Sequence, residues 1–238
     1  MTDDERRIED EAIAYAKANR TAIARRLADS KLFPGEADPV SVFMAGSPGA
    51  GKTEASIALL EELAAEGGPR VLRIDPDELR AELPGYNGGN AWLFQRAVVP
   101  IVERIHDLAL QQKQSFLLDG TLSNYAVAER NILRSLDRGR VVQILYVYQE
   151  PASAWKFVQA RESLDGRQIR PETFVEQFFA ARDVVERLKV KFGQEVKVDL
   201  LLKNLDGSNR SYQANVEQIA SYVPEKYSVE DVQKVVRG

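Results

Sequence analysis

The sequence predicts an α/β fold of three layers, in which a mostly parallel central sheet is flanked by helices. Two observations carry this prediction. Short apolar runs alternate with longer stretches of helical periodicity between residues 40 and 202, and strands separated by helices of this length form parallel sheets with right-handed crossovers. In addition, the first apolar run leads directly into a glycine-rich turn that opens a helix. We therefore expect one α/β core with appendages.

The N-terminal region differs from the rest of the chain. Residues 4–30 carry apolar side chains at roughly helical spacing among many charges, which predicts an amphipathic helix or a pair of helices. Residues 31–39, KLFPGEADP, combine two prolines with a glycine and are typical of a linker. We therefore divide the chain into an N-terminal helical segment with its linker at 1–38 and an α/β domain at 39–238.

The α/β domain at 39–238 shows a regular order of predicted elements. Strands are expected at 40–45, 70–74, 115–118, 141–147 and 198–202, and helices at 52–66, 91–112, 125–137, 151–163 and 171–190, followed by a helical tail. Gly67, Gly68 and Pro69 end the first of these helices. Pro100 predicts a kink or a break in the second, because proline removes a backbone donor from the helix.

Composition excludes several function classes. A net charge of -4 argues against a general binder of long nucleic acid or of membrane surfaces, although a local basic cleft is still allowed. The chain has no cysteine, so disulfides and thiolate metal sites are excluded, and a single histidine leaves no histidine-rich zinc site. No signal peptide is visible in the charged N-terminal residues, and no apolar run reaches the length of a membrane span. We therefore expect a cytoplasmic protein.

The glycine-rich turn matches the pattern G-x-x-x-x-G-K-[ST] in full. Its residues are Gly46, Ser47, Pro48, Gly49, Ala50, Gly51, Lys52 and Thr53. Such a P-loop lets backbone N–H groups and a helix N-terminus converge on phosphate oxygens. Lys52 is expected to reach the β- and γ-phosphates of ATP or GTP, and the Thr53 hydroxyl to ligate Mg²⁺. A turn without a ligand is disfavoured, because the motif stands between a predicted strand and a predicted helix.

Three classes of P-loop protein compete. A GTPase should carry Asn-Lys-x-Asp, whereas Lys203 and Asn204 stand in the reverse order. A motor usually has a strand ending in Asp-Glu, whereas Asp119 is followed by Gly120. These departures favour a kinase, with a three-layer P-loop kinase-like fold, that transfers phosphate to a small acceptor. A nucleotide-dependent regulatory switch and a kinase for another nucleotide or a nucleic-acid end stay open as alternatives.

Two groups of side chains fit a kinase. Asp75 and Asp77 follow the strand at 70–74, where ligands bind in open α/β sheets, although both could also cap a helix. Arg161, Arg167 and Arg170 cluster around a glycine turn, within an expected lid at about 151–172. Arginines on a lid can close over phosphates and neutralise their charge. Solvated surface arginines are the alternative interpretation.

Aromatic side chains could stack on a nucleobase. Trp92, Phe94 and Trp155 lie near expected helix starts, where aromatic residues more often fill a core. We favour the core for all three. His106 lies among apolar residues and is expected to be structural.

The ordered set of motifs resembles the zeta toxins, P-loop kinases of bacterial toxin–antitoxin systems. The resemblance runs over roughly residues 40–205 and rests on GSPGAGKT, IDPDELR, LLDGTLSN, Arg161 and GRQIRP. It implies transfer of the ATP γ-phosphate to the 3′-hydroxyl of UDP-N-acetylglucosamine or a related UDP-sugar. It also implies a possible antitoxin partner. The loop at 83–90, LPGYNGGN, differs most from the family.

The resemblance also implies roles for individual residues. The catalytic aspartate of the family falls on Asp77, and Asp75 takes the preceding acidic position. Substrate contacts fall on Asp75, Asp119, Thr121 and Glu103. The two arginines that contact phosphate fall on Arg161 and Arg167, with Arg170 as the alternative for the second. Lys52 and these arginines would bear the charge of the transferring phosphoryl group.

Overall fold

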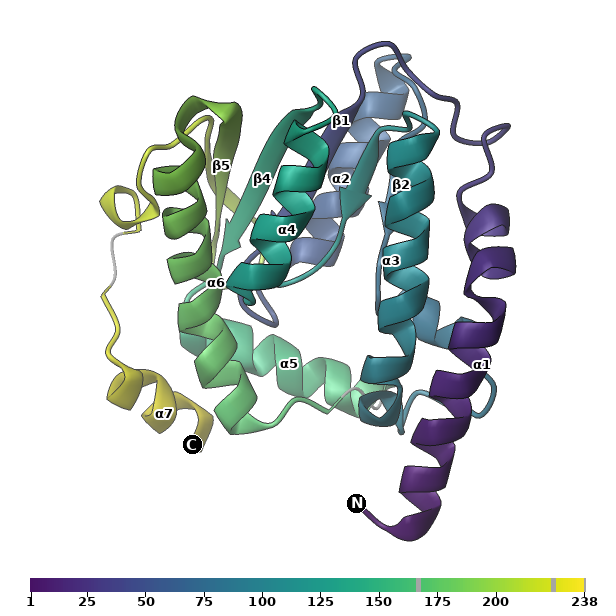
Figure 1. Cartoon of the computed structure of the whole chain (residues 1–238). Helices are drawn as coiled ribbons and strands as arrows, with labels where there is room; N and C mark the ends of the chain where they lie inside the picture. Colours follow the sequence, from purple (N-terminus) through teal and green to yellow (C-terminus); the bar gives the residue numbers. More distant parts are fainter. Residues whose placement is uncertain (166–167, 224–225, 238) are drawn as a thin grey trace.

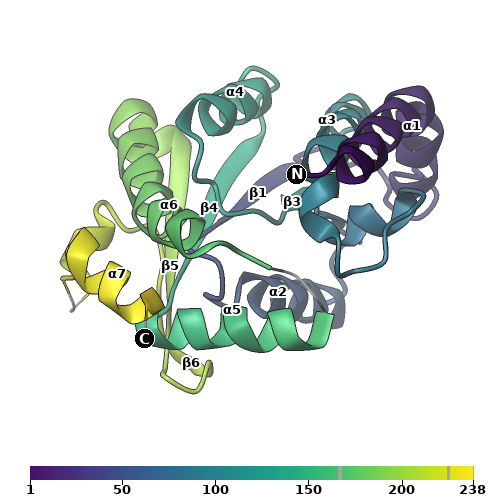
Figure 2. The same ribbon diagram turned by 90° about the horizontal axis from the view of Figure 1, so that it is seen from below.

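A computed structural model describes residues 1–165, 168–223 and 226–237 and shows one sheet between two layers of helices (Figures 1 and 2). The strands are β1 (Val40–Ala45), β2 (Leu72–Ile74), β3 (Phe116–Leu118), β4 (Val141–Tyr148), β5 (Val196–Lys203) and β6 (Asn209–Gln213). The α-helices are α1 (Asp3–Leu27), α2 (Lys52–Ala65), α3 (Gln95–Gln111), α4 (Tyr125–Leu136), α5 (Pro151–Asp165), α6 (Pro171–Phe192) and α7 (Val229–Arg237). Short 3₁₀ helices are η1 (Glu78–Glu82), η2 (Ala91–Phe94), η3 (Gly193–Glu195) and η4 (Ile219–Ser221).

The order of strands places the ends of three of them together. The sheet runs β2-β3-β1-β4-β5-β6, and all neighbouring strands are parallel except β5 and β6. Strand β1 lies in the centre, with β3 on one side and β4 on the other. Because the carboxyl ends of parallel strands share one edge, the segments that follow β1, β2 and β3 converge there. Open α/β sheets bind ligands at this edge.

Alternation along the central strands builds the two faces of the core. In β1, Val42 and Met44 belong to a buried cluster that also contains Ala55 of α2. Phe43 lies between them in the sequence and belongs to the larger cluster on the opposite face, with residues of α3, α4 and α6. Figure 2 shows α2 and α5 on one side of the sheet and α3, α4 and α6 on the other. A parallel sheet covered on both faces needs continuous apolar strands of this kind.

The N-terminal region forms a single helix, not a pair. Thr2 and Glu5 form a reciprocal capping box at the start of α1, and acidic residues fill its first turn. Small buried residues such as Ala12 and Ala16 let α1 pack closely along α3 and η2 (Figure 1). In the described part of the chain, no helix combines the length and apolarity that crossing a membrane requires.

Two local expectations differ from the structure. Helix α3 runs unbroken through Pro100, which lies in its second turn, and the 3₁₀ helix η2 precedes it. The predicted helical tail is wrong in part, because β6 pairs antiparallel with β5 before α7 closes the chain. Strand β6 has the sequence NRSYQ and stands at the edge of the sheet. Edge strands are commonly short and polar, so β6 lacks the apolar signal that marks the inner strands.

Candidate active site

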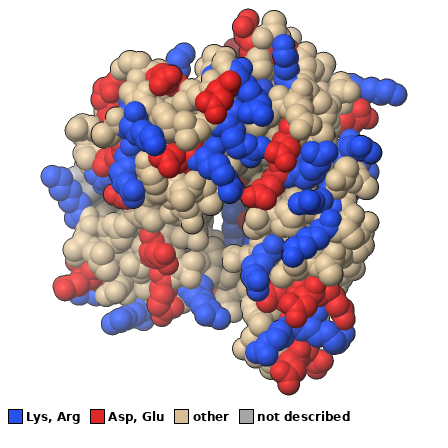
Figure 3. Space-filling view, in the orientation of Figure 1, with Lys and Arg blue, Asp and Glu red and all other residues tan. Residues whose placement is uncertain are grey.

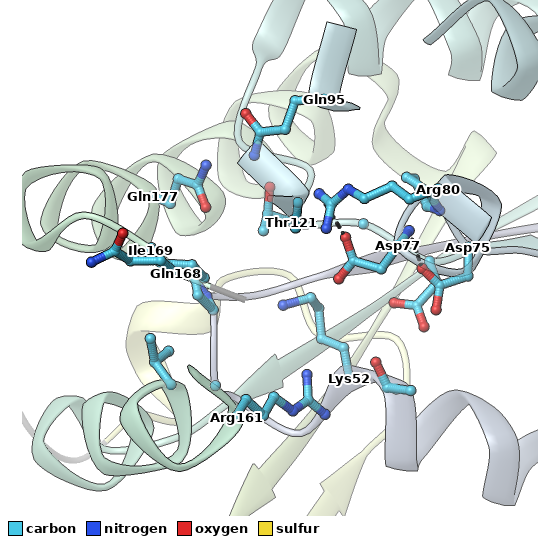
Figure 4. Close-up of a pocket in the computed structure, with 18 of the residues that line it drawn as sticks. Lys52, Asp75, Asp77, Arg80, Gln95, Thr121, Arg161, Gln168, Ile169 and Gln177 are labelled. Atoms are coloured by element: carbon cyan, nitrogen blue, oxygen red, sulfur yellow. Dashed lines mark hydrogen bonds and ion pairs between the residues drawn. The ribbon is translucent and has the colours of Figure 1, made fainter. Parts of the chain in front are cut away.

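A cleft opens where β1, β2 and β3 end, beside the start of α2 (Figure 4). Its volume is about 350 Å³. The lining residues are Pro48, Gly49, Gly51, Lys52, Thr53, Asp75, Pro76, Asp77, Arg80, Ala91, Trp92, Gln95, Asp119, Gly120, Thr121, Val158, Arg161, Gln168, Ile169 and Gln177. The P-loop, two strand ends, η1, η2, α5 and α6 therefore meet at one site, and most of its sequence-predicted residues are brought together there.

The P-loop takes a shape that only glycine allows. Gly46 has φ +136° and Gly49 has φ +72°. A Cβ atom on Gly46 would lie 2.2 Å from the Val147 carbonyl oxygen, and one on Gly49 would lie 2.1 Å from that of Ala154. Gly51, at φ +85°, then caps the N-terminus of α2. The loop is thus pressed against β4 and α5, which fixes the backbone that would surround a phosphate.

Lys52 lies folded over this loop. Its Nζ donates hydrogen bonds to the carbonyl oxygens of Gly46, at 3.0 Å, and of Ser47, at 2.7 Å. Burial lowers the pKa of the Lys52 ammonium to about 8. Ser47 and Ala50 are buried behind the lining, whereas Thr53 faces the cleft.

The Thr53 hydroxyl and the carboxylates at the strand ends are oxygen donors of the type that Mg²⁺ prefers. Mg²⁺ usually takes only one or two such groups from the protein, together with phosphate oxygens and water. Among the described residues, no group of three or more His, Asp or Glu side chains is placed to hold a metal ion. The Thr53 hydroxyl and these carboxylates therefore fit Mg²⁺ that arrives with a nucleotide.

Arg73 joins the acidic residues of two neighbouring strands. Its Nη2 lies 2.6 Å from Asp75 Oδ2 and 2.7 Å from Asp119 Oδ2, and Ser56 donates to the same Asp119 oxygen at 3.1 Å. Burial raises the pKa of the Asp75 carboxyl, and the Asp119 charge adds to this effect. Asp75 also accepts a hydrogen bond from the Asp77 backbone N–H at 2.8 Å. Asp75 thereby fixes the turn that carries Asp77.

Asp77 pairs with an arginine that projects into the cleft. The Nη2 atom of Arg80 lies 2.9 Å from Asp77 Oδ1, and Figure 4 shows the Arg80 side chain extending over Asp77. The Arg80 side chain is 10% exposed, compared with 40% for Asp77. The Arg80 Nε is buried and has no hydrogen-bond partner within the described residues. Arg80 therefore holds the Asp77 carboxylate at the edge of the cleft.

The arginines expected in the lid have different positions. Arg161 of α5 lines the cleft, and its Nη2 lies 2.6 Å from Glu54 Oε1 at the start of α2. Burial alone would raise the pKa of Glu54, but the backbone hydrogen bond and the charge of Arg161 outweigh it and lower that pKa. Arg170 is exposed at the N-terminus of α6 and is not part of the lining. Arg167 lies outside the described residues.

Thr121 and Glu103 also differ in position. Thr121 lines the cleft, where its Oγ1 lies 2.9 Å from Ser123 Oγ and its carbonyl accepts from the Gly46 N–H. Glu103 is not in the lining and instead pairs with Arg130 of α4 at 2.9 Å. Eight residues of α-helix separate Glu103 from Gln95, which corresponds to about 12 Å along the axis. The structure thus does not bring Glu103 into the cleft.

On the surface over α4, basic side chains are paired with acidic ones. Figure 3 shows basic side chains gathered there with acidic side chains beside them. Arg130 pairs with Glu103, Arg134 with Asp107, and Lys191 with Glu129. Below this surface, His106 is buried and packs edge-on against Phe116, with ring centroids 4.8 Å apart. Burial lowers the pKa of His106 to about 3, so its imidazole is neutral at ordinary pH.

Sequence reasoning missed several residues of the site. Arg73 and Arg80 flank the acidic pair in RIDPDELR, and a charge next to paired carboxylates was the available signal. Glu54 directly follows the P-loop. Trp92 was expected in the core, but it lines the cleft and is 38% exposed, whereas Phe94 and Trp155 are buried as expected. Gln95, Gln168 and Gln177 carried no local signal.

The chain is similar in family and in fold to known proteins. A family model described as Zeta toxin matches residues 23–217. A structure from the PezAT chromosomal toxin–antitoxin system of Streptococcus pneumoniae has a TM-score of 0.62 at 17% identity, covering 100% of this chain and 89% of that one. The AvrRxo1-ORF1:-ORF2 complex with ATP has a TM-score of 0.58 at 16% identity, covering 92% and 71%. The same complex with sulphate ions gives 0.59, at the same identity and coverage.

No curated protein sequence matches the chain. At these identities the solved structures show the fold alone, and they confirm the predicted three-layer P-loop kinase-like architecture.

Proposed function

The chain belongs to the zeta toxin family, and on this premise we propose that it is an ATP-dependent kinase that phosphorylates a hydroxyl group of a small acceptor. The acceptor that the resemblance favours is UDP-N-acetylglucosamine or a related UDP-sugar, with the 3′-hydroxyl as the reacting group. The observation that carries the proposal is the position of Asp77, which lies in the same cleft as Lys52 and Arg161. One cleft thus contains side chains that can bind the phosphates, Lys52 and Arg161, and a carboxylate that can bind an acceptor hydroxyl, Asp77.

The donor nucleotide would occupy the P-loop. Backbone N–H groups of the loop and the N-terminus of α2 would surround the β- and γ-phosphates. Lys52 would exchange its two loop carbonyls for phosphate oxygens, and Arg161 would turn from Glu54 toward the same charge. Thr53 would hold Mg²⁺, which supplies neutralisation of the phosphate oxygens when it is bound. One of the structural relatives is a complex with ATP, which supports ATP as the donor.

Asp77 would act on the acceptor. The Asp77 N–H donates to Asp75 Oδ1 and so fixes the backbone, and the ion pair with Arg80 orients the Asp77 carboxylate. Such a carboxylate can accept a hydrogen bond from the acceptor hydroxyl and direct its oxygen in line with the γ-phosphorus. As the new O–P bond forms and the bond to the β,γ-bridging oxygen breaks, the hydroxyl proton passes to Asp77 and ADP leaves. Phosphoryl transfer depends mainly on positioning and electrostatic stabilisation, so an oriented carboxylate suffices. Asp119 and Thr121 face the same space and are the proposed substrate contacts.

A protein partner is part of the proposal. The Streptococcus pneumoniae structure comes from a toxin–antitoxin system. We propose that an antitoxin controls this chain by preventing access to the nucleotide cleft. The expected location is the cytoplasm, where ATP and nucleotide sugars are available.

The test is an acceptor assay with purified protein and Mg²⁺-ATP. Wild type and Asp77→Asn would be incubated with UDP-N-acetylglucosamine, other UDP-sugars and free nucleotides, and the acceptors analysed by mass spectrometry. We expect UDP-N-acetylglucosamine to gain one phosphate, with a rate at least about 100-fold lower in Asp77→Asn and ATP binding unchanged. ATP hydrolysis with every acceptor unmodified would contradict the proposal and favour the regulatory switch.

A further inference from the structure

Opposite the P-loop, the cleft is bounded by side chains that do not belong to the phosphate-binding loop. We call this part the far wall; it consists of Arg80, Trp92, Gln95 and Gln177. Figure 4 shows Gln95 across the cleft from Lys52 and Arg161, with Gln177 approaching from α6. Three of these four side chains are uncharged, and Arg80 is paired with Asp77. The far wall is therefore suited to an uncharged part of a ligand.

Trp92 is the large apolar side chain of this wall. In η2, Ala91, Leu93 and Phe94 are all buried, whereas Trp92 is 38% exposed. An indole has an apolar face and an N–H donor, so a partly exposed tryptophan beside a cleft can contact a ligand. Phe94 already fills the core under η2, where its ring contacts Tyr86 at 5.5 Å between centroids. The core position is thus taken, and Trp92 is left facing the cleft.

Gln95 shares the face of Trp92. Residues at i and i+3 of a 3₁₀ helix are eclipsed, and Gln95 directly follows the last residue of η2. Both side chains are exposed, and both line the cleft. A carboxamide has two donors and an acceptor that can bind the polar edge of a ring. The backbone of η2 therefore presents a flat apolar surface and an amide side by side.

We propose that Trp92 and Gln95 form the recognition surface for a ring of the phosphoryl acceptor. The indole stacks on the flat face of this ring, and the Gln95 carboxamide binds its polar edge. The inference rests on the proposed kinase function and names the side chains that bind the ring of its acceptor, whether this ring is a nucleobase or a sugar. Stacking on tryptophan is chemistry that both rings share, and the test separates them.

The first test measures binding without turnover. Trp92 and Trp155 are the only tryptophans in the chain, so Trp155→Phe leaves Trp92 as the only indole fluorophore. Trp155 is buried against Phe174, and phenylalanine keeps an aromatic ring there. We expect UDP-N-acetylglucosamine to change the fluorescence saturably. UDP alone reproduces the change if the base stacks, and N-acetylglucosamine alone reproduces it if the sugar stacks. No change with any of the three probes would overturn the inference.

The second test measures kinetics. Trp92→Ala should raise the KM for the acceptor roughly 5- to 100-fold, because stacking of one base contributes about one to two factors of ten. The KM for ATP should change little, and Trp92→Phe should recover most of the acceptor affinity. Tyr15→Ala is the matched control, because Tyr15 is 40% exposed on α1 and is not part of the lining.

The outcomes separate this inference from the kinase proposal. Phosphorylation of UDP-N-acetylglucosamine with an unchanged acceptor KM in Trp92→Ala would overturn the recognition surface and leave the kinase intact. A saturable fluorescence change on addition of UDP-N-acetylglucosamine without phosphate transfer would support the surface and overturn the kinase.

Discussion

The P-loop and the far wall face the same cleft but are built in different ways. The P-loop is a single run of eight residues whose backbone conformation is fixed by glycines and by contact with β4 and α5. The far wall collects separate side chains from η1, η2, the start of α3 and α6. Only the former is contiguous in sequence.

This difference distinguishes recognition of phosphate, which is common to all nucleotides, from recognition of the acceptor, which is specific. A backbone cradle recognises phosphate, which every nucleotide carries, and its requirements are written locally in the sequence. A wall of separate side chains can change one residue at a time without disturbing the cradle. We therefore expect substitutions in the P-loop to abolish binding of any donor, and substitutions in the far wall to change the acceptor or the rate.

The largest expected effect comes from the P-loop backbone. Gly49→Ala places a methyl group 2.1 Å from the Ala154 carbonyl oxygen at φ +72°. We expect the free energy of unfolding to fall by about 1–3 kcal/mol and ATP affinity to fall more than about 100-fold, because the loop must move. Chemical denaturation and calorimetry measure the two quantities.

Gly89→Ala is the control for this change. An added Cβ there meets only Asn87 Oδ1 at 3.7 Å, and the position has no left-handed φ. Equal loss of ATP affinity in both variants would contradict the special role of the loop geometry.

The second effect tests the ion pair between Arg80 of the far wall and Asp77. Arg80→Gln removes the cation that lies 2.9 Å from Asp77 Oδ1. We expect the kcat for acceptor phosphorylation to fall about 10- to 100-fold, because a catalytic group that is no longer positioned loses effective alignment. The Kd for ATP should stay within about threefold, since Arg80 does not belong to the P-loop. Arg80→Lys should restore part of the kcat, and a large change in ATP affinity would contradict the assignment.

The third effect is a pH dependence of the donor site. Burial places the pKa of Lys52 at about 8, and bound phosphate favours the ammonium form, which raises this pKa in the complex. ATP affinity should therefore be constant below about pH 7.5 and fall by up to about tenfold per pH unit above 8. Titration calorimetry from pH 7 to 9.5 measures it. Lys52→Arg stays charged, so a slope equal to that of wild type in this variant would contradict the attribution.

The smallest effect concerns the ion pair between α2 and α5. Glu54→Gln removes the partner of Arg161, but the two side chains are 62% and 34% exposed. We expect less than about 1 kcal/mol of lost stability, as for other exposed pairs. The Kd for ATP should fall by about two- to fivefold, because a negative charge beside the phosphates is removed and Arg161 is released. Glu61→Gln, on the exposed side of α2, should leave both quantities unchanged.

The features that sequence predicts well are those encoded over short distances. The glycines, Lys52 and Thr53 follow one strand, and Asp75 and Asp77 follow the next. Short apolar runs between stretches of helical periodicity are sufficient to predict all five parallel strands. The local chemistry of these segments and the rule for parallel strand ends place them at one edge.

The remaining features depend on contacts that are distant in sequence. Arg73 pairs with Asp119, 46 residues away, and Arg161 pairs with Glu54, 107 residues away. Trp92 is a large aromatic residue like its buried neighbour Phe94, and only the orientation of η2 decides which of the two faces the cleft. Strand β6 is polar because it has a solvent-exposed edge, so hydrophobic periodicity does not reveal it.

In the folded chain, the Lys52 side chain is already held in place by the Gly46 and Ser47 carbonyls. A free lysine side chain loses up to about 2 kcal/mol of rotamer entropy when it is fixed, and here that loss occurs on folding rather than on nucleotide binding. An arriving phosphate therefore meets a lysine that exchanges partners and does not first have to be ordered. Such preorganisation favours rapid association with nucleotide.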